Sequence, residues 1–582
     1  MLRSQFWTSQ FDVNFPYFKP AKPSVRNRPI SGPRDDLHRE RLELGVASRN
    51  RWKRRVSIAG KRPYHNPMIA DDGFDGLAAA EALDRVGAMV DLAGDRNDAG
   101  LTARALALSE RLASRPGLTA EARILLHYFR ANAFDNEMHH AGDAQSWSWE
   151  LAHYDQVLLE LRSAVREEGF ADLDQFRQCQ ILTNLGNKLS AIGRPCEALT
   201  QWDRAIALNA RFAMALGNRG HGLIAYARSL YDRGHAGVLM GSAYAALTAA
   251  SDADAIFDSH ESLALAKRFE AMAAQLASTL PLDAIAQDLN REYSLGRSRA
   301  ERSYRRWALD NRLFLSPLND LGPYSIAAHD VLHLPSMTLG LVDAGPGPPV
   351  AFGFYNQLKQ EYVSARWLCY EGLSEHRAHF SDRETHLFDT LSIPAYSLAV
   401  EKTKIAFRLG YSLFDKIAFF INDYFRVGLP ERAVSFRGIW YERKGDPKPL
   451  STVFKDRENW PLRGLYWLSK DIYEPAFQQV SEPDAEGLAD LRNSLEHKYC
   501  QVHEDLGLGY SRFAPPNGND LGFRIGRDLL EAKTLHILKL ARAALIYLSL
   551  AVHREEAVRR AARPEGLVVS TPLWKWKERR RL

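Results

Sequence analysis

The sequence is poor in cysteine, and its four cysteines do not pair by spacing. Cys179, Cys196, Cys369 and Cys500 lie far apart in a chain of 582 residues, and none forms a CxxC pair. This spacing argues against a zinc ribbon and against a disulfide framework. A chain of this kind fits a reducing compartment, so we expect a cytoplasmic protein.

Long apolar runs are also missing. The most apolar candidate, residues 413–425, is interrupted by Asp415, Lys416 and Asp423. It therefore falls short of the roughly 18 to 20 apolar residues that a membrane-spanning helix needs. The N-terminus lacks the clean apolar segment of a signal peptide. We expect neither a signal peptide nor a membrane partner.

Positive charge is concentrated at one end of the chain. Residues 1–66 hold 15 of the 76 Lys and Arg residues and 5 of the 71 Asp and Glu residues, which leaves 61 basic and 66 acidic residues elsewhere. The body is mildly acidic, so bulk attraction to nucleic acid is weak outside this tail. Residues 1–67 are predicted to be a disordered basic tail, either an arm that contacts RNA or sequence upstream of a translation start at Met68. Residues 563–582 are predicted to be a short basic C-terminal tail.

Residues 74–310 are rich in alanine and leucine at helical spacing. Asn184 and Gly186 recur 34 residues later as Asn218 and Gly220. This period resembles the tetratricopeptide repeat, in which helical hairpins stack because one hairpin cannot cover its own apolar face. The resemblance implies a concave surface for a protein partner. The packing positions of that family are occupied here by Leu185, Gly186, Leu189, Ala198, Trp202 and Ala205.

Residues 311–394 contain more proline and glycine and are predicted to be a connector of mixed structure. Within it, His329 and His333 have the spacing of metal ligands if the segment is helical. The glutamate of the HExxH zinc motif is absent, and Pro335 follows directly. We therefore expect no metal and no cofactor, and a metal hydrolase built on these histidines is kept only as a minor alternative.

Residues 395–562 are predicted to form a helical domain made of an amphipathic helix pair, a polar insertion, a short helix and a long closing helix. The short helix is expected at 489–500, ADLRNSLEHKYC. Leu491 and Leu495 are one turn apart and are expected to face the core. Four residues separate an arginine and a histidine on this helix, which places the two about 7.5 Å apart along its axis.

The residues Arg492, Asn493 and His497 resemble the defining motif of the HEPN superfamily, an arginine, a polar residue and a histidine. The resemblance covers roughly the last 180 residues. It implies an all-α, typically dimeric domain, and in many members a metal-independent endoribonuclease of toxin–antitoxin or phage-defence systems. The expected fold is thus mainly α, a tetratricopeptide-like hairpin array followed by an all-α HEPN-type bundle.

The chemistry of these side chains agrees with RNA cleavage. RNA carries its own nucleophile, the 2′-hydroxyl, so the reaction needs a proton carrier and a cation rather than a metal. An imidazole, with an ordinary pKa of about 6.5, suits His497 to proton transfer. The guanidinium of Arg492 can bind phosphate oxygens, and Asn493 can orient the histidine. Asp415 and Glu496 are possible acidic auxiliaries.

Two other interpretations remain at this stage. Arg492 can form a surface ion pair with Glu496 at i+4, which leaves His497 an ordinary helix residue. The whole protein can also be a non-catalytic scaffold, with repeats that bind a protein and a HEPN-like domain that dimerises or binds a nucleotide. The leading hypothesis is a cytoplasmic, homodimeric ribonuclease acting as a toxin or in phage defence, restrained or triggered through the repeats by a protein partner or antitoxin.

Overall fold

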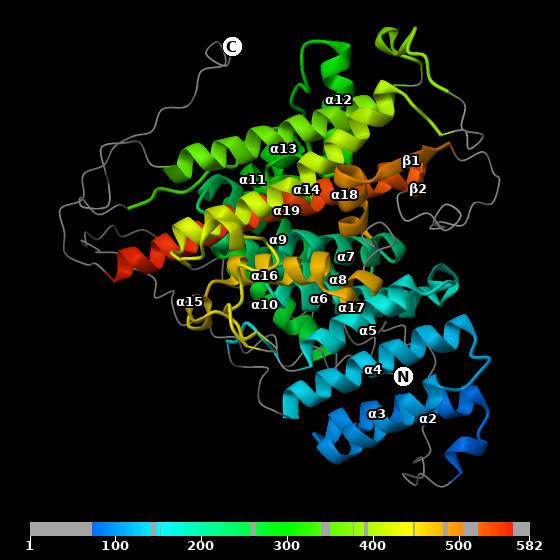
Figure 1. Cartoon of the computed structure of the whole chain (residues 1–582). Helices are drawn as coiled ribbons and strands as arrows, with labels where there is room; N and C mark the ends of the chain where they lie inside the picture. The colour runs from blue at the N-terminus through cyan, green and yellow to red at the C-terminus, as the bar shows by residue number, and fades with distance from the viewer. Residues whose placement is uncertain are drawn as a thin grey trace, which may run out of the picture.

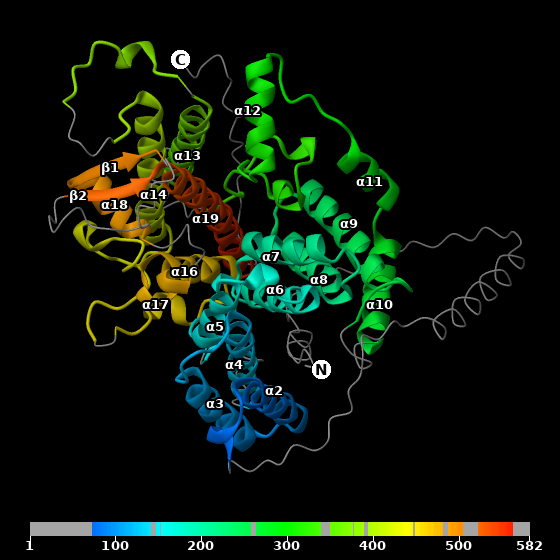
Figure 2. The same cartoon turned by 90° about the vertical axis from the view of Figure 1, so that its right-hand side faces the viewer.

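The computed structural model describes residues 73–140, 147–151, 153–257, 263–338, 350–375, 377–388, 394–445, 448–480, 487–504 and 522–562. The two predicted basic tails lie outside these residues. Helices dominate the described part, and a single pair of short strands accompanies them there, so the prediction of a mainly α protein is confirmed. Figures 1 and 2 show the N-terminal helices at one end of the molecule and the longest helices at the other.

The N-terminal part is a succession of antiparallel helix pairs, as the apolar periodicity predicts. Within each of the first four pairs the two helices contact each other along their length, and these pairs stack in succession, whereas the last three helices of this part do not form such pairs. The helices are α2 (Ala79–Arg96), α3 (Ala99–Ala113), α4 (Ala120–His140), α5 (Tyr154–Arg166), α6 (Gln175–Ala191), α7 (Pro195–Leu208), α8 (Ala213–Ser229), α9 (Arg233–Ala250), α10 (Leu263–Thr279), α11 (Leu282–Asn290) and α12 (Arg299–Asp310), with short 3-10 turns at Phe74–Gly76 and Phe170–Asp172.

The 34-residue recurrence corresponds to the pairs α6–α7 and α8–α9. All six packing positions named above are in the interior, and Trp202 is only 2% exposed. A Cβ added to Gly186 would lie 2.6 Å from Nε1 of Trp202, so only glycine lets the two helices approach this closely. The helical N-terminal part is therefore compatible with repeats.

The connector region begins with two 3-10 turns, Pro317–Leu321 (η5) and Ser325–Ala327 (η6). Residues 328–338 are not helical. His329 and His333 consequently do not share a helix face, and the geometric premise of the metal alternative is wrong. Between them, Asp330 turns inward to the buried guanidinium of Arg366, whose Nη2 lies 2.7 Å from Oδ2.

The C-terminal part is built around three long helices that pack along one another in Figures 1 and 2. Its shorter elements follow the polar insertion and cover one side of the long helices. The elements are α13 (Val350–Ser374), α14 (Leu398–Tyr424), α15 (Thr452–Lys455), α16 (Trp460–Tyr473), α17 (Pro475–Val480), α18 (Leu488–His497), β1 (Tyr499–His503), β2 (Gly522–Gly526) and α19 (Arg527–Ala561), with 3-10 turns at Phe380–Asp382 and Glu431–Ala433.

Two details of this region differ from the prediction. The helix expected at 489–500 ends at His497, because the chain becomes extended at Lys498 and continues as β1. Strands β1 and β2 pair in parallel, with Tyr499 opposite Gly522, and the sequence analysis predicted neither strand. The segment that follows the motif histidine is therefore held in place by its pairing in a two-stranded sheet.

Helix α19 is the core helix of the molecule. Among the described residues it is the one helix long and apolar enough to cross a membrane by length and composition, and 83% of its most apolar window is buried inside the protein. The sequence analysis named residues 413–425 as the most apolar candidate, whereas α19 is the described helix that passes this test. The inward face carries residues such as Ile537, Leu545 and Leu548, all without exposed surface.

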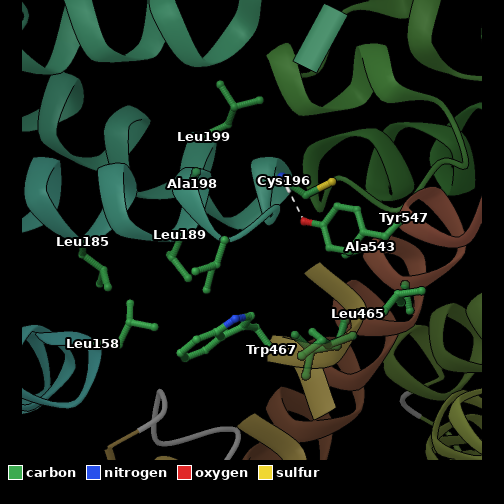
Figure 3. Packing of buried hydrophobic residues seen from close by; sticks show 14 of the residues in the cluster. Leu158, Leu185, Leu189, Cys196, Ala198, Leu199, Leu465, Trp467, Ala543 and Tyr547 are labelled. Carbon is green, nitrogen blue, oxygen red and sulfur yellow. Dashed lines mark hydrogen bonds between the residues drawn. The ribbon is translucent and has the colours of Figure 1, made fainter. Parts of the chain in front are cut away.

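The helical N-terminal part and the C-terminal part share a buried interface, formed by α5, α6 and α7 on one side and α16 and α19 on the other. Figure 3 shows apolar side chains from both sides interleaved, including Leu189 of α6 and Trp467 of α16. The Tyr547 hydroxyl of α19 accepts a hydrogen bond of 3.1 Å from the backbone N–H of Cys196. One hydrophobic core thus runs through both parts.

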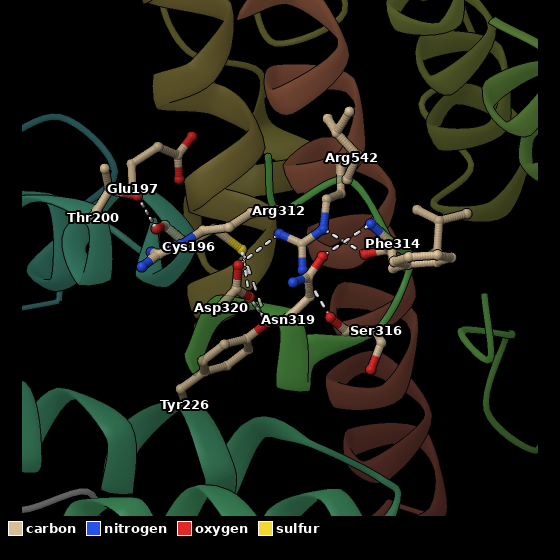
Figure 4. A network of polar contacts seen from close by, with 12 residues as sticks. Cys196, Glu197, Thr200, Tyr226, Arg312, Phe314, Ser316, Asn319, Asp320 and Arg542 are labelled. Carbon is tan, nitrogen blue, oxygen red and sulfur yellow. Dashed lines mark hydrogen bonds and ion pairs between the residues drawn. The ribbon is translucent and has the colours of Figure 1, made fainter. Parts of the chain in front are cut away.

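Charged groups are buried in the same interface. Both Arg162 of α5 and Arg194 before α7 pair with the carboxylate of Asp471 on α16, the former at 2.6 Å. Arg542 of α19 pairs with Asp320 at 2.6 Å and also donates to the backbone carbonyls of Phe314 and Ser316, as Figure 4 shows. Buried ion pairs of this geometry fix the relative position of the elements that carry them.

Candidate active site

Helix α18 places the motif residues at the edge of the C-terminal part. It begins after Gly487, whose φ of 70° turns the chain into the helix. Leu488, Leu491 and Ser494 are buried and form its inner face, toward α14 and α16. The predicted inward position of Leu491 is confirmed, and its residual exposure is 0%.

Arg492 is partly buried at the boundary between this inner face and solvent. Its Nη1 donates a hydrogen bond of 3.1 Å to Oδ1 of Asn493. Its Cζ lies 6.0 Å from the ring centroid of Tyr411 on α14, at the outer range of a cation–π contact. Within the described residues Arg492 forms no ion pair, so the predicted alternative of a pair with Glu496 is not realised there.

Two tyrosines support the guanidinium from α14 and α16. The rings of Tyr411 and Tyr473 meet edge to face at 6.3 Å between centroids. Burial raises the pKa of both hydroxyls, and Arg492 acts in the opposite direction on each. These phenols therefore remain protonated and polar beside the cation. The sequence analysis did not predict either tyrosine as a site residue, because each has the spacing of an ordinary residue in an amphipathic helix.

Asp415 lies one helical turn beyond Tyr411 on α14 and is partly buried. Its Oδ1 accepts a hydrogen bond of 3.1 Å from the backbone N–H of Phe436, which anchors the polar insertion. It also acts electrostatically on both tyrosines. Asp415, the predicted auxiliary carboxylate, therefore lies near Tyr411, which in turn contacts Arg492. The hydrogen bond that Asp415 accepts holds the backbone at Phe436.

His497 is the last residue of α18 and is exposed, as are Asn493 and Glu496. Its imidazole is accessible to solvent at the C-terminal end of the helix. Immediately beyond it, the hydroxyls of Tyr499 and Tyr396 are 2.7 Å apart, and the two side chains are 45% and 43% exposed. A strip of polar and aromatic surface therefore continues from the histidine along the edge of β1.

Metal-binding groups are absent from this surface as far as the structure describes it. No cluster of three or more His, Cys, Asp or Glu side chains that can hold a metal ion occurs among the described residues. Helix α18 carries the guanidinium of Arg492, the amide of Asn493 and the accessible imidazole of His497. Such a set can bind a phosphate and transfer a proton.

Comparison with known proteins agrees with this geometry. Residues 342–555 match the family model described as LA2681-like HEPN, and α18 with its three motif residues lies inside the match. The match begins before the predicted domain start at 395 and takes in α13. No curated protein and no solved structure matches the chain. The chain therefore carries an LA2681-like HEPN domain in its C-terminal region, joined to a helical N-terminal part that is compatible with repeats.

Proposed function

We propose that this protein is a metal-independent endoribonuclease whose reaction takes place at Arg492, Asn493 and His497. One observation carries the proposal: the HEPN motif lies on a helix that exposes His497 and Asn493 and leaves Arg492 without an ion pair in the described part of the chain. A merely structural motif arginine would be expected to pair with a neighbouring acid. HEPN domains are linked to ribonucleases, which supports the same reaction class.

The proposed reaction is an internal transesterification. The ribose 2′-oxygen attacks the adjacent phosphorus, the bond from phosphorus to the 5′-oxygen breaks, and the products are a 2′,3′-cyclic phosphate and a 5′-hydroxyl. One proton leaves the 2′-hydroxyl and one reaches the 5′-oxygen, and His497 carries one of these transfers. Arg492 stabilises the charge that grows on the phosphate oxygens, and Asn493 positions the phosphate or the imidazole.

Each reaction needs two proton-transfer groups, whereas one chain supplies one motif histidine. A homodimer that brings two copies of α18 together across a two-fold axis provides the second. The substrate is RNA and the location cytoplasmic in this proposal. The biological setting is toxicity or phage defence, with the helical repeats as the surface through which a protein partner or antitoxin controls the HEPN domain.

The test is cleavage of total RNA by the full chain and by Arg492→Ala and His497→Ala. We expect each variant to lose at least about 100-fold in rate, because each removes charge stabilisation or proton transfer. EDTA should leave the wild-type rate unchanged. The new 3′ ends should carry a cyclic phosphate, detected by their resistance to 3′-end ligation until the phosphate is removed, and the new 5′-hydroxyl ends should accept a phosphate label directly.

The matched control is Lys498→Ala, which removes an exposed cation next to the motif without touching it. It should cleave within about threefold of wild type. A double Arg492 and His497 variant that cleaves like wild type would refute the proposal. Complete absence of cleavage by the wild type, with a single protein captured by the repeats, would support the non-catalytic scaffold instead.

A further inference from the structure

Two exposed tyrosines lie directly beyond the motif helix. Tyr499 is the first residue of β1, two positions after His497, and Tyr396 lies just before the start of α14. Their side chains are 45% and 43% exposed, and their hydroxyl oxygens are 2.7 Å apart. We call these two residues the tyrosine pair. Their side chains adjoin at the surface instead of packing into the core.

The tyrosine pair is held in a fixed position, although its members are 103 positions apart in the sequence. The backbone N–H of Ala395 donates a hydrogen bond of 2.7 Å to the carbonyl of Val502, which ties the segment before α14 to β1. On β1, Nε2 of Gln501 donates a hydrogen bond of 2.9 Å to the hydroxyl of Tyr499. The residue directly opposite Tyr499 is Gly522, which contributes no side chain that would cover the ring. Exposed rings fixed in this way form a preorganised surface for stacking.

A cation lies on the same small sheet. Arg524 of β2 is opposite Gln501 in the strand register, and its Nε donates a hydrogen bond of 3.1 Å to Oε1 of Gln501. Arg524 is half-buried and forms no ion pair within the described ranges. Glu504, just after β1, is instead paired with Arg527 at 2.7 Å. The remaining N–H groups of the Arg524 guanidinium are therefore available to bind a phosphate.

The chain keeps the tyrosine pair close to the motif. Because two residues span at most about 7 Å, the Cα atoms of His497 and Tyr499 cannot be farther apart than this. Both β1 and β2 contact α18, and Figure 1 shows the three elements together at one edge of the molecule. A nucleotide next to a phosphate bound at His497 is thus within reach of the tyrosine pair.

We propose that the tyrosine pair stacks against an unpaired base beside the cleaved phosphate, so that the substrate is single-stranded RNA. This inference rests on the proposed function and specifies its substrate. Aromatic side chains stack on bases of any identity, because every base has a flat π face. Bases inside a duplex are already stacked on one another and present no free face. Arg524 binds a phosphate of the same strand, and the tyrosine pair positions the substrate without taking part in proton transfer.

The test is binding of a fluorescent 2′-O-methyl oligouridine to the full chain, measured by anisotropy. The methyl group removes the nucleophile, so the measurement does not depend on cleavage. Tyr396→Ala combined with Tyr499→Ala should raise the Kd at least about tenfold, because the loss of one stacked base has an effect of this size. Phenylalanine at both positions keeps the rings and should retain most of the affinity. A duplex of the same strand with 2′-O-methyl oligoadenosine should bind the wild type at least about tenfold more weakly.

The matched control is Tyr244→Ala combined with Tyr293→Ala, the same change at two half-buried tyrosines outside the HEPN match. It should leave the Kd within about twofold of wild type, because distant sites act independently. Unchanged melting of all variants verifies the fold, and light scattering gives their oligomeric state.

Four results would overturn the proposal: an unchanged Kd in the alanine variant, an equal loss in the control, equal binding of the duplex, or a change of oligomeric state in the alanine variant alone. The last result would assign the tyrosine pair to a contact between subunits. A wild type that binds single-stranded RNA through the tyrosine pair but cuts none would support this inference and refute the ribonuclease. A wild type that cuts RNA while the alanine variant binds as tightly would do the reverse.

Discussion

The burial of His221 on α8 makes the folding stability of the protein depend on pH. Burial, followed by the nearby charges of Arg268 and Arg228, lowers the pKa of His221 to about 4. The unfolded chain takes up a proton near the ordinary histidine value of about 6.5, whereas the folded protein does so only near pH 4. The unfolded state therefore binds more protons between these values, and folding stability falls as the pH is lowered through this window.

Replacement of His221 by glutamine should remove this part of the acid sensitivity. The full shift corresponds to about 3 kcal/mol, and partial exposure of the side chain reduces the expected effect to roughly 1 to 2 kcal/mol. Melting temperatures of wild type and H221Q at pH 7.5 and pH 4.5 measure it. The value at pH 7.5 gives the packing cost of the substitution alone. An identical pH-dependent loss in both proteins would contradict the assignment.

At the scale of elements, α16 and the loop between α6 and α7 touch through two glycines. Gly193 has a φ of 89°, and a Cβ on Gly464 of α16 would lie 2.1 Å from its carbonyl oxygen. The contact leaves no room for a side chain on either residue. The close packing of α16 against the loop between α6 and α7 therefore depends on glycine at both positions.

We expect Gly464→Ala to force α16 away from the loop and to lower the free energy of unfolding by about 1 to 3 kcal/mol, as overpacking does. Gly353→Ala on α13 is the matched control. No atom lies within 4 Å of the Cβ that it would add. Because alanine favours the helix, this variant should be stabilised by up to about 1 kcal/mol. Urea unfolding compares the two, and equal effects would argue against the close approach.

At the scale of the whole molecule, Asp471 joins the helical N-terminal part to the HEPN domain through its ion pairs with Arg162 and Arg194. Burial opposes its ionisation, yet the guanidinium groups of Arg162 and Arg194 hold the pKa of Asp471 at about 2. Because the folded value lies below the unfolded value of about 3.9, the stability that this group contributes is present above pH 4. It is lost as the pH falls toward 2.

Asp471→Asn should leave two buried guanidinium groups with less compensating charge and lower the free energy of unfolding by about 3 to 5 kcal/mol. The interface between the two parts should also become more sensitive to limited proteolysis. Glu401→Gln, which breaks the half-exposed pair with Lys404, is the control and should cost less than about 1 kcal/mol. If the two variants unfold at the same urea concentration, the buried pair does not hold the domains together.

Local patterns in the sequence were enough to predict much of the helical architecture. Apolar spacing predicted the helix pairs of the N-terminal part, the closing helix α19 and the inward side of α18 at Leu491, because each depends on residues within a few turns. The spacing of Arg492, Asn493 and His497 predicted the HEPN resemblance, and the family match confirms the recognition. The catalytic roles of these residues stay a prediction, as do the domain boundaries.

Contacts between segments that are distant in the sequence decided the features that the sequence analysis did not predict. The end of α18 at His497, the pairing of β1 with β2, and the approach of Tyr411 and Tyr473 to Arg492 join residues that are far apart in the chain. The sequence by itself determined which segments are helical and which helix carries the motif. Tertiary structure alone decided how the helical N-terminal part packs on the HEPN domain, because burial and charge pairing across hundreds of residues leave no periodic signal in the local sequence.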